Sequence, residues 1–149
     1  RFEYKGELNG AKIYDDYAHH PGEIHVLLQT AKSLGYQRVI CAFQPHTYSR
    51  TKALFDDFVQ ELQLADLTLL AEIYPAREVN TIGISSKDLA AKIPNAEYYP
   101  TFAELEARLR QLARPGDLIL TVGAGELDQV SNALVKKTTK NECNSSAQI

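Results

Sequence analysis

The chain has 149 residues, of which 44% are hydrophobic and 23% charged, a balance typical of one compact domain with its own core. Its 16 basic and 19 acidic residues give a formal net charge of -3, which argues against a nucleic-acid-binding protein. No apolar run approaches the roughly 20 residues of a membrane span, and no signal peptide opens the sequence. We therefore expect a cytoplasmic protein.

Strand and helix patterns alternate along the chain, and turn residues separate them. The expected elements are, in chain order, strands at Phe2–Tyr4 and Lys12–Asp15, a helix from Pro21 to Gly35, the strand RVICAF, a helix with Leu54, Phe55, Phe58, Val59 and Leu62 on one face, the strand LTLLAEI, a helix from Ser85 to about Lys92, the strand AEYYP, the helix TFAELEARLRQLA, the strand DLILTV and the helix ELDQVSNALVKK.

Apolar strands that alternate with helices predict an α/β fold. We expect a domain of three layers, with a mostly parallel sheet of about six strands and helices on both faces. Residues 1–138 form this domain in our interpretation, and the polar residues 139–149 are expected to be disordered because they have little to bury.

Two dense polar stretches follow expected strands and precede expected helices: DDYAHHP at Asp15–Pro21, and QPHTYSRT. In open α/β sheets, ligands bind at the carboxyl ends of parallel strands, in loops that lead into helices. If the two strands are neighbours, the stretches line one cleft. Its side chains would be those of Asp15, Asp16, Tyr17, His19, His46, Tyr48 and Arg50.

Each stretch also has a purely structural interpretation, since an aspartate before a helix is commonly a cap and His-Pro is an ordinary helix entry. No metal site is expected, because His20 and His25 miss the spacing of a helical zinc pair and no cysteine cluster assists them. Arg50, in contrast, is expected in the first turn of a helix, where its positive charge opposes the helix dipole. An anionic ligand or a nearby aspartate would explain a cation at this position.

The stretch TVGAGELD contains two glycines, Gly123 and Gly125, but lacks the third glycine of a dinucleotide fingerprint. We interpret it as a tight turn between a strand and a helix. No glycine is followed by lysine, so the chain has no GxxxxGK phosphate loop. If the protein uses a nucleoside triphosphate, other residues must hold the phosphates.

Together, DDYAHHPGEI and FQPHTYSRTKALFDDF resemble paired signatures of the C-terminal domain of the Mur ligases. The similarity continues through EIYPAREVN, GISSKDL and GDLILTVGAGEL, and it thins only in the tail. Within this bacterial family, FQPHTYSRT is similar to the branch that adds L-alanine to UDP-N-acetylmuramate in peptidoglycan biosynthesis. An autonomous small α/β ligand-binding or metal-binding module remains the alternative.

The resemblance implies an ATP-dependent ligase in which ATP phosphorylates the muramoyl carboxylate and the amine of L-alanine attacks the acyl phosphate. It also implies a Rossmann-like fold for this chain and two further domains outside it, an N-terminal one for the UDP-sugar and a central ATPase domain. Those domains would be the partners of this one. ATP and Mg²⁺ would serve the full-length enzyme, and neither is expected to be held by this domain alone.

The resemblance further implies roles for single residues, with no catalytic residue within this domain alone. Asp15 or Asp16 corresponds to the carboxylate that meets the nucleotide. The residues that correspond to the L-alanine site are Tyr17, His19, His46 and Arg50. Two positions depart from the family pattern: Thr47 stands where many relatives have arginine, and Ala18 replaces a common glycine.

Overall fold

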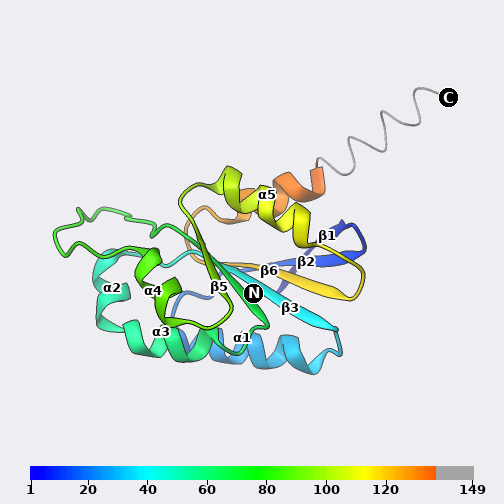
Figure 1. Ribbon diagram of the computed structural model, residues 1–149, viewed down its shortest axis with the longest axis horizontal. Helices are drawn as coiled ribbons and strands as arrows, with labels where there is room; N and C mark the ends of the chain where they lie inside the picture. Colours follow the sequence, from blue (N-terminus) through cyan, green and yellow to red (C-terminus); the bar gives the residue numbers. More distant parts are fainter. Residues whose placement is uncertain (137–149) are drawn as a thin grey trace.

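The computed structural model describes residues 1–136, and Figure 1 shows its elements. The expected tail at 139–149 lies outside the described residues. The elements are β1 (Glu3–Leu8), β2 (Ala11–Asp16), α1 (Pro21–Ser33), β3 (Arg38–Phe43), α2 (Tyr48–Ala53), α3 (Phe55–Leu62), β4 (Leu67–Ala71), α4 (Ser86–Lys92), β5 (Ala96–Tyr99), α5 (Phe102–Leu112) and β6 (Asp117–Val122). Residues 128–136 form a further helix.

The six strands form one sheet in the order β1-β2-β6-β3-β4-β5. β1 pairs with β2 in the antiparallel direction, and all other neighbours are parallel. The predicted α/β class with a mostly parallel sheet of about six strands is thus confirmed. However, β6 lies between β2 and β3, so the strands that precede the two polar stretches are not neighbours.

Helices cover both faces of the sheet, as the three-layer prediction requires. On one face, Ile24 of α1, Phe58 of α3 and Leu89 of α4 are fully buried in a single core cluster. On the other face, Leu105 of α5 and Leu134 of the helix at 128–136 belong to a second cluster. Figure 1 shows α1, α3 and α4 on one side of the strands and α5 on the opposite side.

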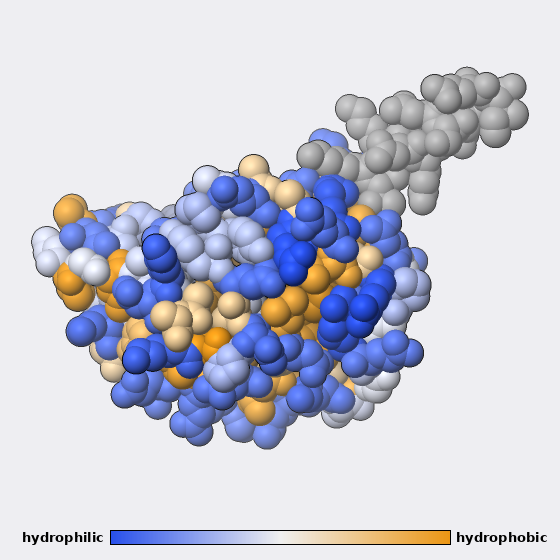
Figure 2. Space-filling view, in the orientation of Figure 1, coloured by the Kyte–Doolittle hydropathy of each residue, from blue (hydrophilic) through white to orange (hydrophobic). Residues whose placement is uncertain are grey.

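Most of the surface seen in Figure 2 is hydrophilic, with hydrophobic side chains gathered beside α5 and at the tip of the loop between β4 and α4. Val79 and Ile82 of that loop are among the exposed large hydrophobic residues. Among the helices of residues 1–136, none combines the length and the apolar character that crossing a membrane requires.

Local capping explains where several helices begin. The ring of His20 accepts a hydrogen bond from Gly22 N at 3.2 Å, and the Glu23 carboxylate accepts from His20 N at 3.1 Å, which together form a capping box before α1. Ser85 and Asp88 form the same arrangement before α4, at the position where the sequence predicted the start of a helix.

The helix predicted after QPHTYSRT is wrong in its start and its continuity. α2 begins inside that stretch because the Thr47 hydroxyl accepts a hydrogen bond from Arg50 N at 3.3 Å and so acts as its N-cap. The backbone then leaves the helical region at Leu54, with φ -112° and ψ 21°, before α3 continues in a new direction. Arg50 consequently lies in a short helix of six residues.

A buried ion pair joins the amino ends of β3 and β6, at the opposite end of the strands from the polar stretches. The Arg38 guanidinium donates to both oxygens of Asp117 at 2.9 and 2.7 Å, and to Leu112 O at 2.7 Å. Asp117 is only 1% exposed and also accepts from Arg114 N. The two central strands therefore depend on this carboxylate for their alignment.

We predict that Asp117→Ala lowers the free energy of unfolding by about 3 kcal/mol, because it leaves Arg38 without its buried partner. Urea denaturation measures this change. The matched control is Glu3→Ala, which breaks an exposed pair with Lys5 and should change stability by less than about 0.5 kcal/mol. Equal losses in the two variants would contradict the assignment.

Candidate functional site

The candidate site lies at the carboxyl edge of the parallel strands, where main-chain hydrogen bonds tie the strand-end loops together. Gly123 N donates to Asp16 O, and Gln44 N donates to Val122 O, both at 3.0 Å. The end of β6 is therefore bonded to the residues that end β2 and follow β3. This arrangement brings the two polar stretches toward each other although their strands are not adjacent.

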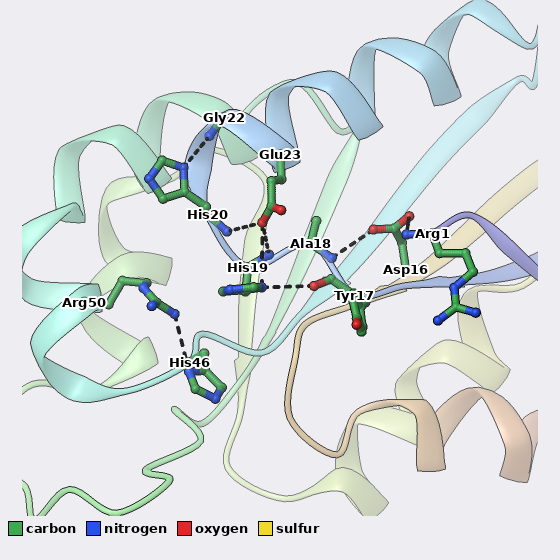
Figure 3. A network of polar contacts seen from close by, with 10 residues as sticks. All are labelled: Arg1, Asp16, Tyr17, Ala18, His19, His20, Gly22, Glu23, His46 and Arg50. Atoms are coloured by element: carbon green, nitrogen blue, oxygen red, sulfur yellow. Dashed lines mark hydrogen bonds and ion pairs between the residues drawn. The ribbon is translucent and has the colours of Figure 1, made fainter.

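His19, His46 and Arg50 form one group on this edge. Arg50 Nη1 lies 3.4 Å from His46 Nδ1, and the ring centroids of His19 and His46 are 5.9 Å apart. The ring of Tyr74, from the loop after β4, stacks on His46 at 5.4 Å. Three of the four residues expected at the L-alanine site thus lie together, with the fourth, Tyr17, turned to the other side (Figure 3).

Hydrogen-bond partners indicate the protonation of the two rings. His19 Nδ1 lies 3.1 Å from Tyr17 O, and a carbonyl only accepts, so Nδ1 donates and Nε2 is the acceptor of the neutral ring. Arg50 only donates, so His46 Nδ1 accepts and its Nε2 carries the proton. Burial lowers the pKa of His46, the charge of Arg50 lowers it further, and a proton gained by His19 would act in the same direction. The group therefore presents two donors, from Arg50 and His46, beside one acceptor.

Asp16 and Tyr17 lie on the other side of the loop that follows β2. The Asp16 carboxylate accepts from Ala18 N at 2.8 Å, and the main-chain nitrogen of Arg1 lies 2.8 Å from its second oxygen. Tyr17 is 54% exposed. Both line an open groove of about 590 Å³ whose apolar wall includes Val26 and Leu27 of α1.

Asp15 faces the opposite side of the sheet from Asp16. Its carboxylate accepts a hydrogen bond from the Thr121 hydroxyl at 2.6 Å. Burial raises the pKa of Asp15, while the Thr121 contact acts in the opposite direction. The prediction that Asp15 and Asp16 line the same cleft is therefore wrong. Neighbouring residues of a strand point to opposite faces, so Asp15 and Asp16 cannot share a cleft.

The remaining histidines have local partners. His20 caps α1, and the ring of His25 contacts the Glu61 carboxylate of α3 through Nδ1. Among residues 1–136, no group of three or more His, Cys, Asp or Glu side chains is placed to hold a metal ion.

Four residues contribute to the site in ways that were not predicted from the sequence. Gly123 and Gly125 form the turn that TVGAGELD predicted, and they also leave room for the loop after β3. A side chain at Gly125 would lie 2.8 Å from the Gln44 amide oxygen and 2.9 Å from the Tyr74 ring. Tyr74 and Glu78, from the loop after β4, were not among the predicted site residues.

Glu78 lies against the start of α2 from this loop. Its carboxylate accepts from Ser49 N at 3.0 Å and from the Ser49 hydroxyl. These hydrogen bonds, with a smaller contribution from Tyr48 N, lower the pKa of Glu78. The negative charge of the Glu78 carboxylate therefore lies close to His46 and Arg50.

The fold and the site define a class of protein: an α/β domain that groups polar side chains at the carboxyl ends of its parallel strands. A family model described as the Mur ligase, glutamate ligase domain matches residues 1–125. The chain therefore belongs to the Mur ligase family, as the resemblance predicted.

Curated relatives support a narrower placement within this family. The chain is 50% identical over 141 residues to the UDP-N-acetylmuramate–L-alanine ligase of Agathobacter rectalis, and 48% identical over 141 residues to that of Lachnoclostridium phytofermentans. Each match covers 92% of this chain but only 31% and 30% of the relatives. The chain thus spans about a third of their length.

Solved structures share the same fold. The UDP-N-acetylmuramate-alanine ligase of Thermotoga maritima superposes with a TM-score of 0.68 at 28% identity, over 89% of this chain and 28% of the other. A murein peptide ligase of Psychrobacter arcticus gives a TM-score of 0.69 at 23% identity, over 90% and 28% of the two chains. The second match shows the fold alone.

We predict that His46 titrates below the ordinary histidine pKa of 6.5, because burial and Arg50 both disfavour its charged form. NMR titration of the ring resonances measures this pKa. Arg50→Gln should move it upward toward 6.5, since the variant removes the neighbouring positive charge. Lys52→Gln, which removes a cation from the same helix, is the control. A His46 pKa that is unchanged in Arg50→Gln would contradict the proposed contact.

Proposed function

We propose that this chain is the C-terminal domain of an ATP-dependent ligase that joins L-alanine to UDP-N-acetylmuramate in bacterial peptidoglycan synthesis. The observation that carries the proposal is the 50% identity over 92% of the chain to a relative of that name. The site geometry supports it, because an amino acid carries both a carboxylate and an amine.

The donors and the acceptor of the site match these two groups. The Arg50 guanidinium and the protonated Nε2 of His46 suit the carboxylate of L-alanine, and guanidinium–carboxylate pairs are among the strongest charge-assisted contacts. The free Nε2 of His19 suits a hydrogen bond from the amine. Together they would orient the amine toward an acyl group supplied by the rest of the enzyme.

We further propose that the groove with Asp16 and Tyr17 meets the nucleotide. Asp16 is favoured over Asp15 because Asp15 faces the other side of the sheet and is bonded to Thr121. The Tyr17 ring is exposed beside the apolar wall formed by Val26 and Leu27, and aromatic rings of this kind can pack against a base. ATP and the amino acid would then contact opposite sides of the loop after β2.

In this proposal, ATP phosphorylates the muramoyl carboxylate, and the alanine amine attacks the acyl phosphate to release phosphate and form the amide. The phosphate-binding residues, Mg²⁺ and the UDP-sugar site belong to the N-terminal and central domains of the full-length ligase. This domain binds and orients L-alanine when the domains close. It contributes no residue that forms or breaks a bond.

Arg50→Ala in the full-length ligase should raise the KM for L-alanine far more than the KM for ATP. Loss of a charge-assisted contact to a charged ligand weakens binding by about 2 to 4 kcal/mol, on the order of 30- to 1000-fold in catalytic efficiency. Steady-state kinetics with each substrate varied in turn measures the two constants. Lys52→Ala serves as the control on the same helix. Equal increases in both constants would instead indicate a structural role for Arg50.

The 149-residue chain alone should bind L-alanine and ATP only in the millimolar range or weaker. Without the other domains each ligand stays largely solvated, and a solvated ion pair contributes about 0 to 1 kcal/mol. Chemical-shift titration of the labelled chain measures both affinities, with Asp16 and Arg50 as the reporters. Saturation at micromolar ligand would mean that the chain is a complete binding module.

A further inference from the structure

The loop between β4 and α4 is bonded to the start of α2 through one carboxylate. Glu78 accepts hydrogen bonds from both the amide and the hydroxyl of Ser49, with 3.0 Å between Ser49 N and the carboxylate. Ser49 directly precedes Arg50. The contact therefore acts on the backbone that carries the proposed carboxylate-binding guanidinium.

The same loop is held at its other end by Tyr74. Thr47 N donates to Tyr74 O, and Tyr74 N donates to Pro45 O, each at 2.8 Å. The Tyr74 ring also stacks on His46. The loop thus contacts the polar stretch on both sides of Thr47, through its main chain at Tyr74 and through a side chain at Glu78.

α2 needs such support because it has only six residues, and helices of this length are unstable without tertiary contacts. Thr47 caps it with a positive φ of 69°, a conformation that residues other than glycine rarely adopt. A strained cap on a short helix persists only when neighbouring groups hold it in place. Glu78 and Tyr74 supply those groups.

We propose that Glu78 is a positioning residue for the amino-acid site: its carboxylate holds Ser49 and thereby fixes the Arg50 guanidinium beside His46. This inference rests on the proposed function for the identity of the ligand. It assigns no contact between Glu78 and the substrate. Glu78 acts through Arg50, in a site that the loop after β4 completes.

Charge makes the carboxylate suited to this role. The Ser49 hydroxyl and amide lower the pKa of Glu78, so it stays ionised at neutral pH and keeps both hydrogen bonds strong. The negative charge also raises the pKa of His46, against the effects of burial and of Arg50. A neutral replacement removes both effects.

The structural part of the proposal is tested on the 149-residue chain by amide hydrogen exchange. Glu78→Ala should speed exchange at Ser49 by at least about tenfold, because that amide loses its acceptor. Thermal unfolding of the same variant shows whether the fold is retained. Glu104→Ala is the matched control, since Glu104 accepts a hydrogen bond from the Thr101 hydroxyl at the start of α5 on the other face. It should leave Ser49 exchange unchanged.

The functional part is tested by kinetics of the full-length ligase. Glu78→Ala and Glu78→Gln should raise the KM for L-alanine by about 10- to 100-fold, and leave the KM for ATP within about twofold, as expected for a displaced binding group. Ser49→Ala should have a smaller effect in the same direction. In the double variant Ser49→Ala with Glu78→Ala, the KM for L-alanine should be little higher than in Glu78→Ala alone, because both substitutions remove the same contact.

Two outcomes would overturn the inference. An unchanged KM for L-alanine in a Glu78→Ala enzyme with fast Ser49 exchange would show that the contact is only structural. Slow Ser49 exchange in that variant would show that Glu78 does not hold α2. Failure of the proposed function would appear instead in the unmodified full-length enzyme, as absence of amide formation with L-alanine, and would remove the ligand on which the inference rests.

Discussion

β6 is the last strand among residues 1–136 and lies between β2 and β3, and the rest of the domain depends on this placement. All six of its residues are buried, and it pairs in parallel with both neighbours. Its end also carries the hydrogen bonds that join Asp16 O to Gly123 N and Gln44 N to Val122 O. Neither the sheet nor the candidate site can be complete until the chain has reached Val122.

Sequence patterns were sufficient to predict the strands and most of the helices, but not the order of the strands in the sheet. Apolar runs and capping residues identified the strands and most helices, because burial and local hydrogen bonds leave a periodic trace. The insertion of β6 between β2 and β3 leaves no such trace, since it depends on contacts between distant segments. The interruption at Leu54 was equally hidden, because neither proline nor glycine marks it.

The candidate site was predictable in part for the same reason. His19, His46 and Arg50 belong to dense polar stretches after strands, and the structure brings them together. The separation of Asp15 from Asp16 follows from strand alternation, but only once β2 is known to extend through Asp16. Glu78 could not be found in this way, because it contacts Ser49 from a loop that has no periodic pattern.

The two sides of the loop after β2 carry different polar groups and therefore suit different ligands. Arg50 and the protonated Nε2 of His46 lie on one side, and the Asp16 carboxylate lies on the other (Figure 3). In the proposed function, the donors of the first side suit the carboxylate of the amino acid, and the Asp16 carboxylate on the second side suits donor groups of the nucleotide such as amines and hydroxyls. Because the loop itself is fixed by the α1 capping box and by Gly123, two ligands bound on its two sides would keep a constant relation to each other. A domain built in this way can orient one reactant against another without supplying a reactive group of its own.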